Sequence, residues 1–449
     1  MTIEEFKNQI NGKNVTVVGI GVSNIPLIDF LVDCGANVTA CDKKERNDII
    51  QTAKALEEKG VTLKLGDGYL NDIDADVIFK SPGIRPDIPE FELARNKGAT
   101  VTSEMELFFD LCPCDIIAVT GSDGKTTTTT LIYEMLKKEG FKCHIGGNIG
   151  KPLIADVKNM TEIDKVVLEL SSFQLFTMRK SPKIAVMTNI APNHLDWHID
   201  YDEYIDSKKN IMRYQDKTDI LVTNSANNIT KSIALDSRGE SRTFSSKGEA
   251  TVHLSGGAIY YGDEKIINAG DIKIPGSHNV ENYMAAIAAV RDYVSDQTIE
   301  YVAKNFGGVE HRIEFVREVL GVKFYNDSIA SSPTRCMAAL KSFDKKLILI
   351  AGGYDKKIPF DELGVKINEK VKELVLLGHT AEKIKRAVET AGKDTNITVC
   401  SGFEEAVLCA YGKAKEGDVV ILSPACASFD MFENFMIRGR KFKEIVNNI

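Results

Sequence analysis

The stretch TGSDGKTTTTT, residues 120–130, decides the class of fold. It follows the apolar, β-branched run DIIAVT and opens TTTTTLIYEMLKKEG, which has helical spacing, so it forms a strand–turn–helix unit. Glycines in such a turn let backbone N–H groups approach phosphate oxygens, Lys125 adds a positive charge, and the Thr126 hydroxyl can hold Mg²⁺. Gly121 and Gly124 stand closer together than the glycines of the widespread nucleotide-binding pattern. We interpret the turn as a phosphate-binding loop, with an ordinary strand-to-helix turn as the alternative.

The rest of the chain repeats this alternation of strands and helices. Ten short apolar runs mostly end in a glycine, serine or asparagine loop, and they are NVTVVGIG, NVTACD, ADVIFKS, DIIAVTGS, KVVLELSS, IAVMTNI, DILVTN, LILIAGG, ELVLLG and DVVILSPA. The pattern predicts an α/β protein with mostly parallel sheets, in which ligands collect at the carboxyl ends of the strands. Segment 243–279 has glycine-separated short strands and is expected to be antiparallel.

The length of 449 residues indicates about three domains. We place them at 1–101, 102–308 and 309–449, and expect a Rossmann-like domain, a central ATP-binding domain and a second Rossmann-like domain in that order.

Composition excludes several classes of function. A net charge of −8, with 43% apolar and 27% charged residues, argues against non-specific binding to nucleic acid or anionic lipid and fits small-molecule substrates. The nine cysteines are scattered and without a CxxC pair, so reduced thiols are expected. No run approaches the roughly 18 apolar residues that cross a membrane. We expect a cytoplasmic protein, and a monomer.

The first domain carries an incomplete dinucleotide fingerprint. VVGIGVSN follows a strand and opens a helix, and Asp42 ends the next strand. Asn24 occupies the place of the third glycine, which weakens an NAD assignment. A tight turn without a ligand and a site for another nucleotide diphosphate are the alternatives. The loop KSPGI, residues 80–84, ends another strand and is expected at the same crevice.

Two further strand ends offer metal ligands. Glu169 lies inside the apolar run KVVLELSS, where a carboxylate must pair with something or sit at the mouth of the strand. His194 follows the strand IAVMTNI and is close to Asp196 and His198. Each of these residues alone is commonly a solvated loop residue. Next to a phosphate loop they favour a Mg²⁺ site, because Mg²⁺ that bridges phosphates needs only one or two protein groups.

These motifs resemble those of the Mur ligases, in the family's order and over nearly the whole chain. The matching segments are TGSDGKTT, GGNIG at 146–150, LELSSFQL at 168–175, NHLDWH at 193–198, GSHNVEN at 276–282, EHRIE at 310–314, YNDSIASSPT at 325–334 and LSPACASFDMFENFMIRG at 422–439. LELSSFQL and the last segment are similar to the D-glutamate-adding branch. The resemblance implies an ADP-forming ligase of cytoplasmic peptidoglycan precursor synthesis, which joins D-glutamate to UDP-N-acetylmuramoyl-L-alanine through an acyl phosphate. ATP and Mg²⁺, as one or two ions, are the implied cofactors.

The resemblance also assigns roles to residues, position by position. Lys125, His194 and Lys208 are implied to be catalytic, and the implied metal ligands are Thr126, Glu169, His194 and Lys208. The implied ATP contacts are Gly121, Ser122, Asp123, Gly124, Lys125, Thr126, Thr127, Asn279, Asn282, Arg312 and Asp327. The sugar nucleotide is implied to bind at Val22, Ser23, Asp42, Lys43, Ser81 and Gly83, with Asn148 near the acceptor, and D-glutamate at Ser331, Lys356, Ser428 and Phe435.

Some assignments leave alternatives open. The spacing from Tyr204 makes Lys208 the counterpart of a family lysine that is carbamylated, but the neighbouring Lys209 leaves the register open by one residue. Many family members have lysine at Ile329 and asparagine at Asp123. Because Arg312 and Asp327 lie outside the central domain, we expect the third domain to close before chemistry.

Rival readings of function differ in what they require. A ligase of the same superfamily would use another amino acid or a folate acceptor, an NAD-dependent oxidoreductase would use the first domain, and a nucleotide-binding switch would bind ATP without acceptor-dependent phosphate release.

Overall fold

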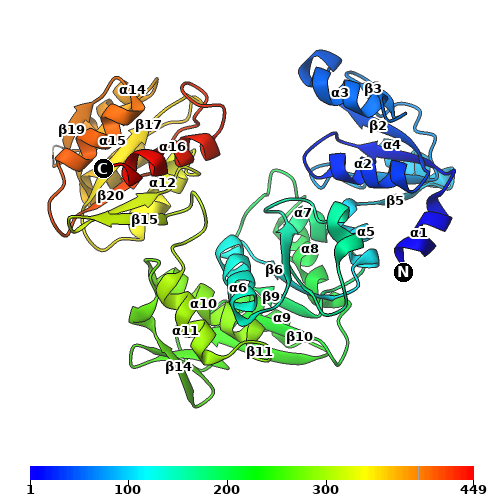
Figure 1. The fold of residues 1–449 in the computed structure, drawn as a ribbon, viewed down its shortest axis with the longest axis horizontal. Coiled ribbons are helices and arrows are strands. Elements are labelled where there is room, and N and C mark those ends of the chain that lie inside the picture. The colour runs from blue at the N-terminus through cyan, green and yellow to red at the C-terminus, as the bar shows by residue number, and fades with distance from the viewer. Residues whose placement is uncertain (393) are drawn as a thin grey trace. The chain divides into compact units, whose positions relative to one another are not determined.

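A computed structural model describes residues 1–392 and 394–449. The chain divides into two compact units: Met1–Ala269 with Glu281–Val302, and Gly270–Val280 with Ala303–Ile449. The first unit holds two β-sheets and the second unit holds one, each flanked by helices (Figure 1). Most strand pairs are parallel, so the expected α/β class is confirmed.

The first sheet has five parallel strands in the order β3-β2-β1-β4-β5. Side chains alternate across it, as the pleat requires: Val17 of β1 packs in one core with Leu27 of α2, and Val18 packs in another with Phe91 of α4. The elements are α1 Ile3–Ile10, β1 Asn14–Val18, α2 Asn24–Asp33, β2 Asn37–Asp42, α3 Ile50–Glu57, β3 Thr62–Leu65, β4 Val77–Lys80, α4 Pro89–Asn96, β5 Thr100–Thr102 and α5 Glu104–Leu111.

The second sheet has nine strands in the order β14-β13-β12-β11-β10-β9-β6-β8-β7. β6, which leads into the phosphate loop, pairs in parallel with β8 on one side and β9 on the other. The parallel part comprises β6 Asp115–Thr120, α6 Lys125–Glu139, β7 Cys143–Gly147, β8 Lys165–Glu169, α7 Ser172–Leu175, β9 Ile184–Met187, α8 Tyr201–Arg213, β10 Ile220–Asn224, α9 Asn228–Ala234 and β11 Glu240–Ser245.

The segment expected to be antiparallel is so only in part. β12 Val252–Ser255, β13 Ala258–Tyr261 and β14 Glu264–Asn268 form an antiparallel meander. β11 pairs in parallel with both β10 and β12, so the reversal of direction begins after β12. The helices α10 Ser277–Val290 and α11 Asp296–Asn305 follow.

The third sheet has six strands in the order β15-β16-β20-β17-β18-β19, and only the β15–β16 pair is antiparallel. Leu349 of β17 packs with Leu363 of α13, while Ile350 packs on the other face with Phe442 of α16. Its elements are β15 Glu314–Val319, β16 Val322–Asn326, α12 Pro333–Lys341, β17 Leu347–Gly352, α13 Asp361–Lys370, β18 Val371–Leu377, α14 Ala381–Ala391, β19 Asn396–Val399, α15 Phe403–Gly412, β20 Val419–Leu422 and α16 Phe435–Asn447.

The predicted domain boundaries can be compared with the ends of the sheets. The first sheet ends at Thr102, beside the predicted boundary at 101, and the third begins at Glu314, just after the boundary predicted at 308. The exact boundaries stay predictions.

None of the helices in the described part of the chain is long and apolar enough to span a membrane.

Candidate active site

The loop between β6 and α6 needs both of its glycines. Gly121 has φ 148° and Gly124 has φ 79°, a region that favours glycine. A Cβ on Gly121 would lie 1.9 Å from Oγ1 of Thr188, and one on Gly124 would lie 2.4 Å from Oδ1 of Asn282. The loop is therefore held close to the end of β9 and to α10, and its backbone follows a path that other residues cannot adopt without strain.

Hydrogen bonds fix the loop from both sides. The Ser122 hydroxyl contacts the Ala191 carbonyl oxygen at 2.8 Å and the Tyr204 hydroxyl at 2.8 Å. The backbone N–H of Asp123, the exposed departure from the family pattern, donates to Oδ1 of Asn189 at 3.0 Å. The Lys125 ammonium donates to the carbonyl oxygens of Gly121 at 3.1 Å and Ser122 at 2.8 Å. A cation therefore lies directly over a preformed loop at the N-terminus of α6, which is the arrangement that phosphate requires.

A carboxylate stands beside the first turn of α6. The Thr126 hydroxyl donates to Oε2 of Glu169 at 2.7 Å, and the Asn148 amide donates to Oε1 of Glu169 at 2.8 Å. Glu169 is buried, with 2% of its surface exposed, at the end of β8. The three residues that sequence reasoning assigned to metal and acceptor are thus brought together, and their oxygens are the hard donors that Mg²⁺ prefers. Thr127 follows Thr126 in the same turn, half-buried.

The structure distinguishes Lys208 from Lys209. Lys208 on α8 is buried, and its ammonium donates to the Gly121 carbonyl oxygen at 2.9 Å and to Oγ1 of Thr120 at 3.2 Å. Burial, reinforced by the charge of Lys125, holds the pKa of Lys208 well below its usual value. Lys209 is half-buried and lies 4.0 Å from the carboxylate of Asp236. Only Lys208 faces the phosphate loop.

His194 and His198 have different surroundings. His194 is largely exposed, at φ 54°, and partial burial of its ring, followed by the charges of Lys125 and Lys208, lowers its pKa. Its imidazole is therefore neutral near pH 7 and has a lone pair to offer. His198 is buried and bonded to Ser172 Oγ at 2.9 Å and to Oε2 of Glu203 at 3.2 Å. His198 thus has a structural setting, although the sequence places it in the same loop.

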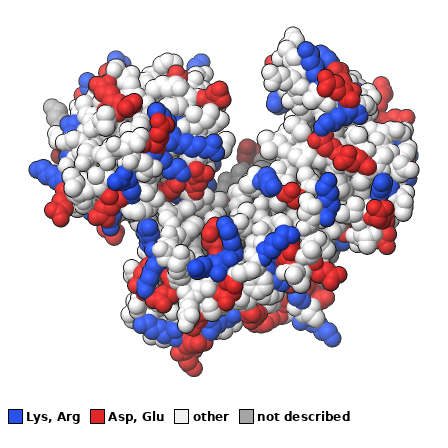
Figure 2. All heavy atoms as spheres, in the orientation of Figure 1, with Lys and Arg blue, Asp and Glu red and all other residues white. Residues whose placement is uncertain are grey.

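No three His, Cys, Asp or Glu side chains among the described residues gather closely enough to hold a metal ion by themselves. Acidic and basic side chains are interspersed over the face drawn in Figure 2.

The turn after β1 is held by Asn24, at the place of the missing glycine. Its amide donates to the Gly19 carbonyl oxygen at 2.8 Å, to the Val18 carbonyl oxygen at 3.3 Å and to Oγ of Ser81 at 3.0 Å. Asp42 accepts from the backbone N–H of Ile20 at 2.7 Å. Asn24 therefore ties the turn to the loop after β4. The sequence did not predict this role, because the fingerprint has a glycine at this position and not an asparagine.

The predicted sugar-nucleotide residues surround this turn. Val22, Lys43 and Gly83 are exposed, while Ser23, Asp42 and Ser81 are half-buried. Ser23 lies just before α2 without a side-chain capping bond.

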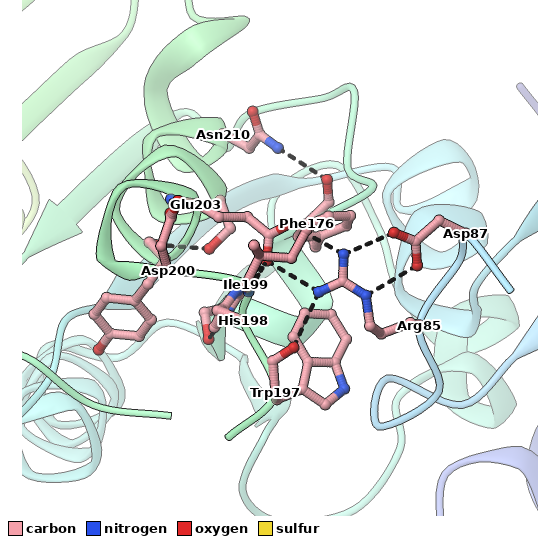
Figure 3. Close-up of polar contacts among 12 residues, drawn as sticks. Arg85, Asp87, Phe176, Trp197, His198, Ile199, Asp200, Glu203 and Asn210 are labelled. Atoms are coloured by element: carbon pink, nitrogen blue, oxygen red, sulfur yellow. Dashed lines mark hydrogen bonds and ion pairs between the residues drawn. The ribbon is translucent and has the colours of Figure 1, made fainter. Parts of the chain in front are cut away.

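Arg85 was missed by sequence reasoning, and nothing in its local sequence indicates its role. It follows Gly83 in the loop after β4 and lies between the carboxylates of Asp87 and Glu203, with Trp197 beside it (Figure 3). Glu203 belongs to α8, the helix that carries Lys208.

In the second unit, Asp327 directly follows β16 in a buried position. Its carboxylate accepts from Ser423 Oγ at 2.7 Å and from the Ile313 N–H at 3.3 Å, and burial raises its pKa to about 7. The neighbouring Arg312 is exposed and Ile329 is half-buried. Asn279 donates to the Pro275 carbonyl oxygen at 2.6 Å in the Gly270–Val280 segment, whereas Asn282 belongs to the first unit.

A second arginine that the sequence did not reveal lies between two segments that adjoin predicted glutamate residues. Arg438, with 1% of its surface exposed, donates to Ser328 Oγ at 3.0 Å, to the Ser328 carbonyl oxygen at 2.9 Å and to the carbonyl oxygens of Cys426 and Ala427 at 3.1 and 3.2 Å. It thus joins the segment before Ser331 to the segment before Ser428. Of the predicted residues themselves, Ser428 is buried, Ser331 and Phe435 are half-buried, and Lys356 is exposed.

Comparisons with known proteins place this geometry in one class. Three family models match successive parts of the chain: a Mur ligase MurD-like N-terminal domain at residues 13–103, a Mur ligase middle domain at 119–290 and a Mur ligase glutamate ligase domain at 311–426. The chain belongs to the Mur ligase family.

Similar proteins define the branch. A protein of Acetivibrio thermocellus named UDP-N-acetylmuramoylalanine–D-glutamate ligase is 54% identical over 100% of this chain and 99% of its own length. A protein of the same name from Clostridium novyi is 52% identical, again over 100% of this chain and 99% of its own.

Solved structures share the fold at low identity. The UDP-N-acetylmuramate-alanine ligase of Thermotoga maritima aligns with a TM-score of 0.59 at 19% identity, covering 97% of this chain and 99% of its own. The MurF ligase of Thermotoga maritima in complex with ADP aligns with a TM-score of 0.57 at 17% identity, covering 98% and 97%.

Proposed function

We propose that this chain is an ADP-forming ligase that joins D-glutamate to UDP-N-acetylmuramoyl-L-alanine by way of an acyl phosphate. The relatives above, at 54% and 52% identity over the full chain, are named as ligases of UDP-N-acetylmuramoylalanine and D-glutamate. The observation in the structure that carries the proposal is the Lys125 ammonium above the glycine loop, with the Thr126–Glu169 pair beside it. An NAD-dependent oxidoreductase would give neither group a task.

The roles of the residues follow from the charge that the reaction gathers. An acceptor carboxylate and a triphosphate repel each other, so the loop N–H groups and Lys125 are proposed to neutralise the transferring phosphoryl group. Mg²⁺, when bound, would add positive charge on the phosphate oxygens. Thr126 and Glu169 would hold it, with the neutral imidazole of His194 as a further ligand. Asn148 keeps the Glu169 carboxylate turned toward Thr126.

Lys208 is proposed to be the carbamylated lysine. A carbamate forms when a neutral amine attacks CO₂, and a lowered pKa supplies the neutral amine. Lys208 has that lowered pKa because it is buried beside Lys125, whereas Lys209 pairs with a carboxylate outside the loop. The product would be an anion next to the metal position, so carbamylation replaces repulsion between two lysines with attraction.

The other two substrate sites are proposed on the turn after β1 and in the second unit. Ser81 and Gly83 lie beside the Asn24-bonded turn, whose N–H groups suit the diphosphate of a uridine nucleotide rather than a full dinucleotide. Ser331, Lys356, Ser428 and Phe435 are proposed to bind D-glutamate, with Lys356 opposite a carboxylate.

The deciding experiment measures phosphate release from ATP and Mg²⁺ with UDP-N-acetylmuramoyl-L-alanine, comparing D-glutamate with L-glutamate, L-lysine, meso-diaminopimelate and no amino acid. Release that requires D-glutamate and is lost in Lys125→Ala supports the proposal. Release with another amino acid would keep the ligase chemistry and overturn the glutamate pocket. ATP binding without acceptor-dependent release would favour a nucleotide switch.

A further inference from the structure

Arg85, in the loop after β4, bonds to Trp197 and to Glu203 of α8. We call this set of contacts the bridge, because it joins the part of the chain with the first sheet to the loop that carries His194 and the helix that carries Lys208. The Arg85 guanidinium donates to Oδ1 of Asp87 at 2.9 Å and Oδ2 at 2.7 Å, and to Oε2 and Oε1 of Glu203 at 3.0 Å each. It also donates to the Trp197 carbonyl oxygen at 3.0 Å and lies 5.0 Å from the centre of the Trp197 ring. Figure 3 shows the guanidinium enclosed by these groups.

Two partners of Arg85, Trp197 and Glu203, are themselves held by further hydrogen bonds. The Trp197 indole N–H donates to the Gly83 carbonyl oxygen at 2.9 Å, so a second bond crosses between the same two segments. Oε2 of Glu203 also accepts from the Ile199 N–H at 2.9 Å and contacts Nδ1 of His198 at 3.2 Å. The loop that precedes α8 is therefore hydrogen-bonded to Glu203 in the first turn of α8. Arg85 in turn connects Glu203 to the loop after β4.

The Arg85–Glu203 contact differs from an ordinary surface ion pair in its burial and in its geometry. Side-chain exposure is 21% for Arg85 and 20% for Glu203, and the contact is bidentate, which adds geometric specificity to charge. Surface pairs usually contribute little, but a planar guanidinium that is paired twice and stacked on an indole fixes an orientation.

We propose that Arg85 is a positioning residue, which sets His194 and the start of α8 relative to the sugar-nucleotide loop at Ser81–Gly83. This inference rests on the proposed function and extends it, because it assigns to one side chain the alignment of the acceptor with the phosphate loop. Arg85 touches neither group directly; it acts through Trp197 and Glu203.

Trp197 is the single tryptophan of the chain, so its fluorescence reports on the bridge without any assay of activity. Arg85→Ala should move the Trp197 emission to longer wavelength, because water replaces the guanidinium over the indole. Arg85→Lys should not keep the wild-type emission, since an ammonium cannot form bidentate pairs with two carboxylates while it lies over the indole. Arg179→Ala is the matched control. Arg179 is exposed and lines the same cavity, of about 790 Å³, as Asp87 and Glu203.

Kinetics then separate positioning from mere stability. In Arg85→Ala we expect the KM for UDP-N-acetylmuramoyl-L-alanine and the half-saturating Mg²⁺ concentration to rise about tenfold, the size of a lost charge-assisted hydrogen bond, with the KM for ATP unchanged. The double variant with Glu203→Ala should be no worse than either single variant. Circular dichroism confirms that each variant is folded.

The outcomes divide cleanly. An emission shift together with the KM change supports the proposal. An emission shift with unchanged KM and Mg²⁺ dependence overturns it, as does a KM change without a shift or a KM for ATP that rises equally. Wild-type protein without D-glutamate-dependent release would instead sink the proposed function, while the emission data would still test the bridge.

An independent observation concerns two thiols in CPC, between α5 and β6. Sγ of Cys112 lies 3.7 Å from Sγ of Cys114, and both residues are half-buried around the exposed Pro113. The hydrogen bond between the thiols lowers the pKa of Cys112 and raises that of Cys114. In the described part of the chain the nine cysteines are thiols.

We infer that Cys112 and Cys114 form a reversible oxidation site for hydroperoxides. The Cys112 thiolate attacks an oxygen of the hydroperoxide and the O–O bond breaks. The departing hydroxide or alkoxide takes a proton and leaves as water, when the oxidant is hydrogen peroxide, or as an alcohol. The Cys114 sulfur then attacks the resulting sulfenic sulfur, the S–S bond forms, and water leaves with the Cys114 proton. Two thiols lose two electrons and the peroxide gains them; a dithiol reductant reverses the step.

Mass spectrometry tests this site in the full chain. After limiting hydrogen peroxide, the peptide holding Cys112 and Cys114 should be lighter by two hydrogens and resist alkylation until reduced. Cys114→Ser should instead accumulate a sulfenic acid that dimedone labels. Cys409→Ser is the control and should behave as wild type. The thiol of Cys409 is hydrogen-bonded to the thiol of the buried Cys400. Prior oxidation of any other cysteine, or a pair that stays reduced while others oxidise, overturns the inference.

Discussion

The two glycine turns of the first unit, one after β1 and one after β6, solve the same problem in different ways. Each connects a parallel strand to the helix that follows it. The loop after β6 is shaped by steric exclusion, because a Cβ on Gly121 would lie 1.9 Å from Thr188 Oγ1. The turn after β1 is shaped by a side chain, because the Asn24 amide bonds to Gly19 and Ser81. Charge separates them too: Lys125 lies over one loop, and Asp42 accepts from the other.

A glycine pattern therefore indicates a turn, whereas the side chains around the turn determine which ligand it suits. A loop with a lysine over it and a carboxylate beside it suits a triphosphate with Mg²⁺. A turn that is pinned to a second loop suits a ligand that lies across both.

The largest effect should come from removing the charge over the second loop. Lys125→Ala should lower kcat about 100- to 1,000-fold, because a group aimed at developing charge is lost. Lys43→Ala, an exposed lysine near the first turn, should change the KM for the sugar nucleotide no more than about fivefold. Steady-state kinetics compares them, and equal losses would erase the distinction between the turns.

Steric exclusion should separate the turns in stability. Gly121→Ala should lower the free energy of unfolding by about 2–4 kcal/mol, because it combines overpacking with a left-handed φ. Gly21→Ala in the first turn should change it by no more than about 0.5 kcal/mol, since a Cβ there meets no atom within 4 Å. Urea unfolding measures both. Similar losses at the two positions would contradict the steric account.

Asn24 tests the side-chain mechanism of the first turn. Asn24→Ala should destabilise the protein by about 1–2 kcal/mol, because its hydrogen bonds to Val18, Gly19 and Ser81 are lost. Asn24→Gly restores the third glycine of the dinucleotide fingerprint and should weaken binding of the uridine nucleotide without creating affinity for NAD. Isothermal titration with UDP and with NAD checks this; NAD binding by the variant would show that Asn24 excludes the dinucleotide.

The smallest effect is a dependence on pH. Burial and the charges of Lys125 and Lys208 lower the pKa of His194, so the imidazole stays neutral to a lower pH than a free histidine of pKa about 6.5. The half-saturating Mg²⁺ concentration should therefore stay constant from about pH 8 to 7 and rise only below the ordinary histidine range. His194→Asn should remove the rise. A rise already present between pH 8 and 7 would contradict the lowered pKa.

The sequence by itself determined the elements and most of the motifs. The strand–turn–helix at 115–139, the alternation of apolar runs, Glu169 at the end of β8 and His194 in the loop after β9 depend on neighbours a few residues away. Such local patterns can be predicted from the sequence. The parallel β11 pairing and the antiparallel β15–β16 pair were not foreseen, because strand partners are chosen by packing across long separations.

Tertiary structure decided what depends on distant partners. The spacing from Tyr204 favours Lys208 but leaves the register open by one residue, and it is the fold that turns Lys208 toward the phosphate loop and Lys209 toward Asp236. Arg85 resembles any loop arginine until Trp197 and Glu203, which lie 112 and 118 positions away, enclose it. A single sequence records chemistry and local spacing, but a charge acquires its role from the groups that folding brings around it.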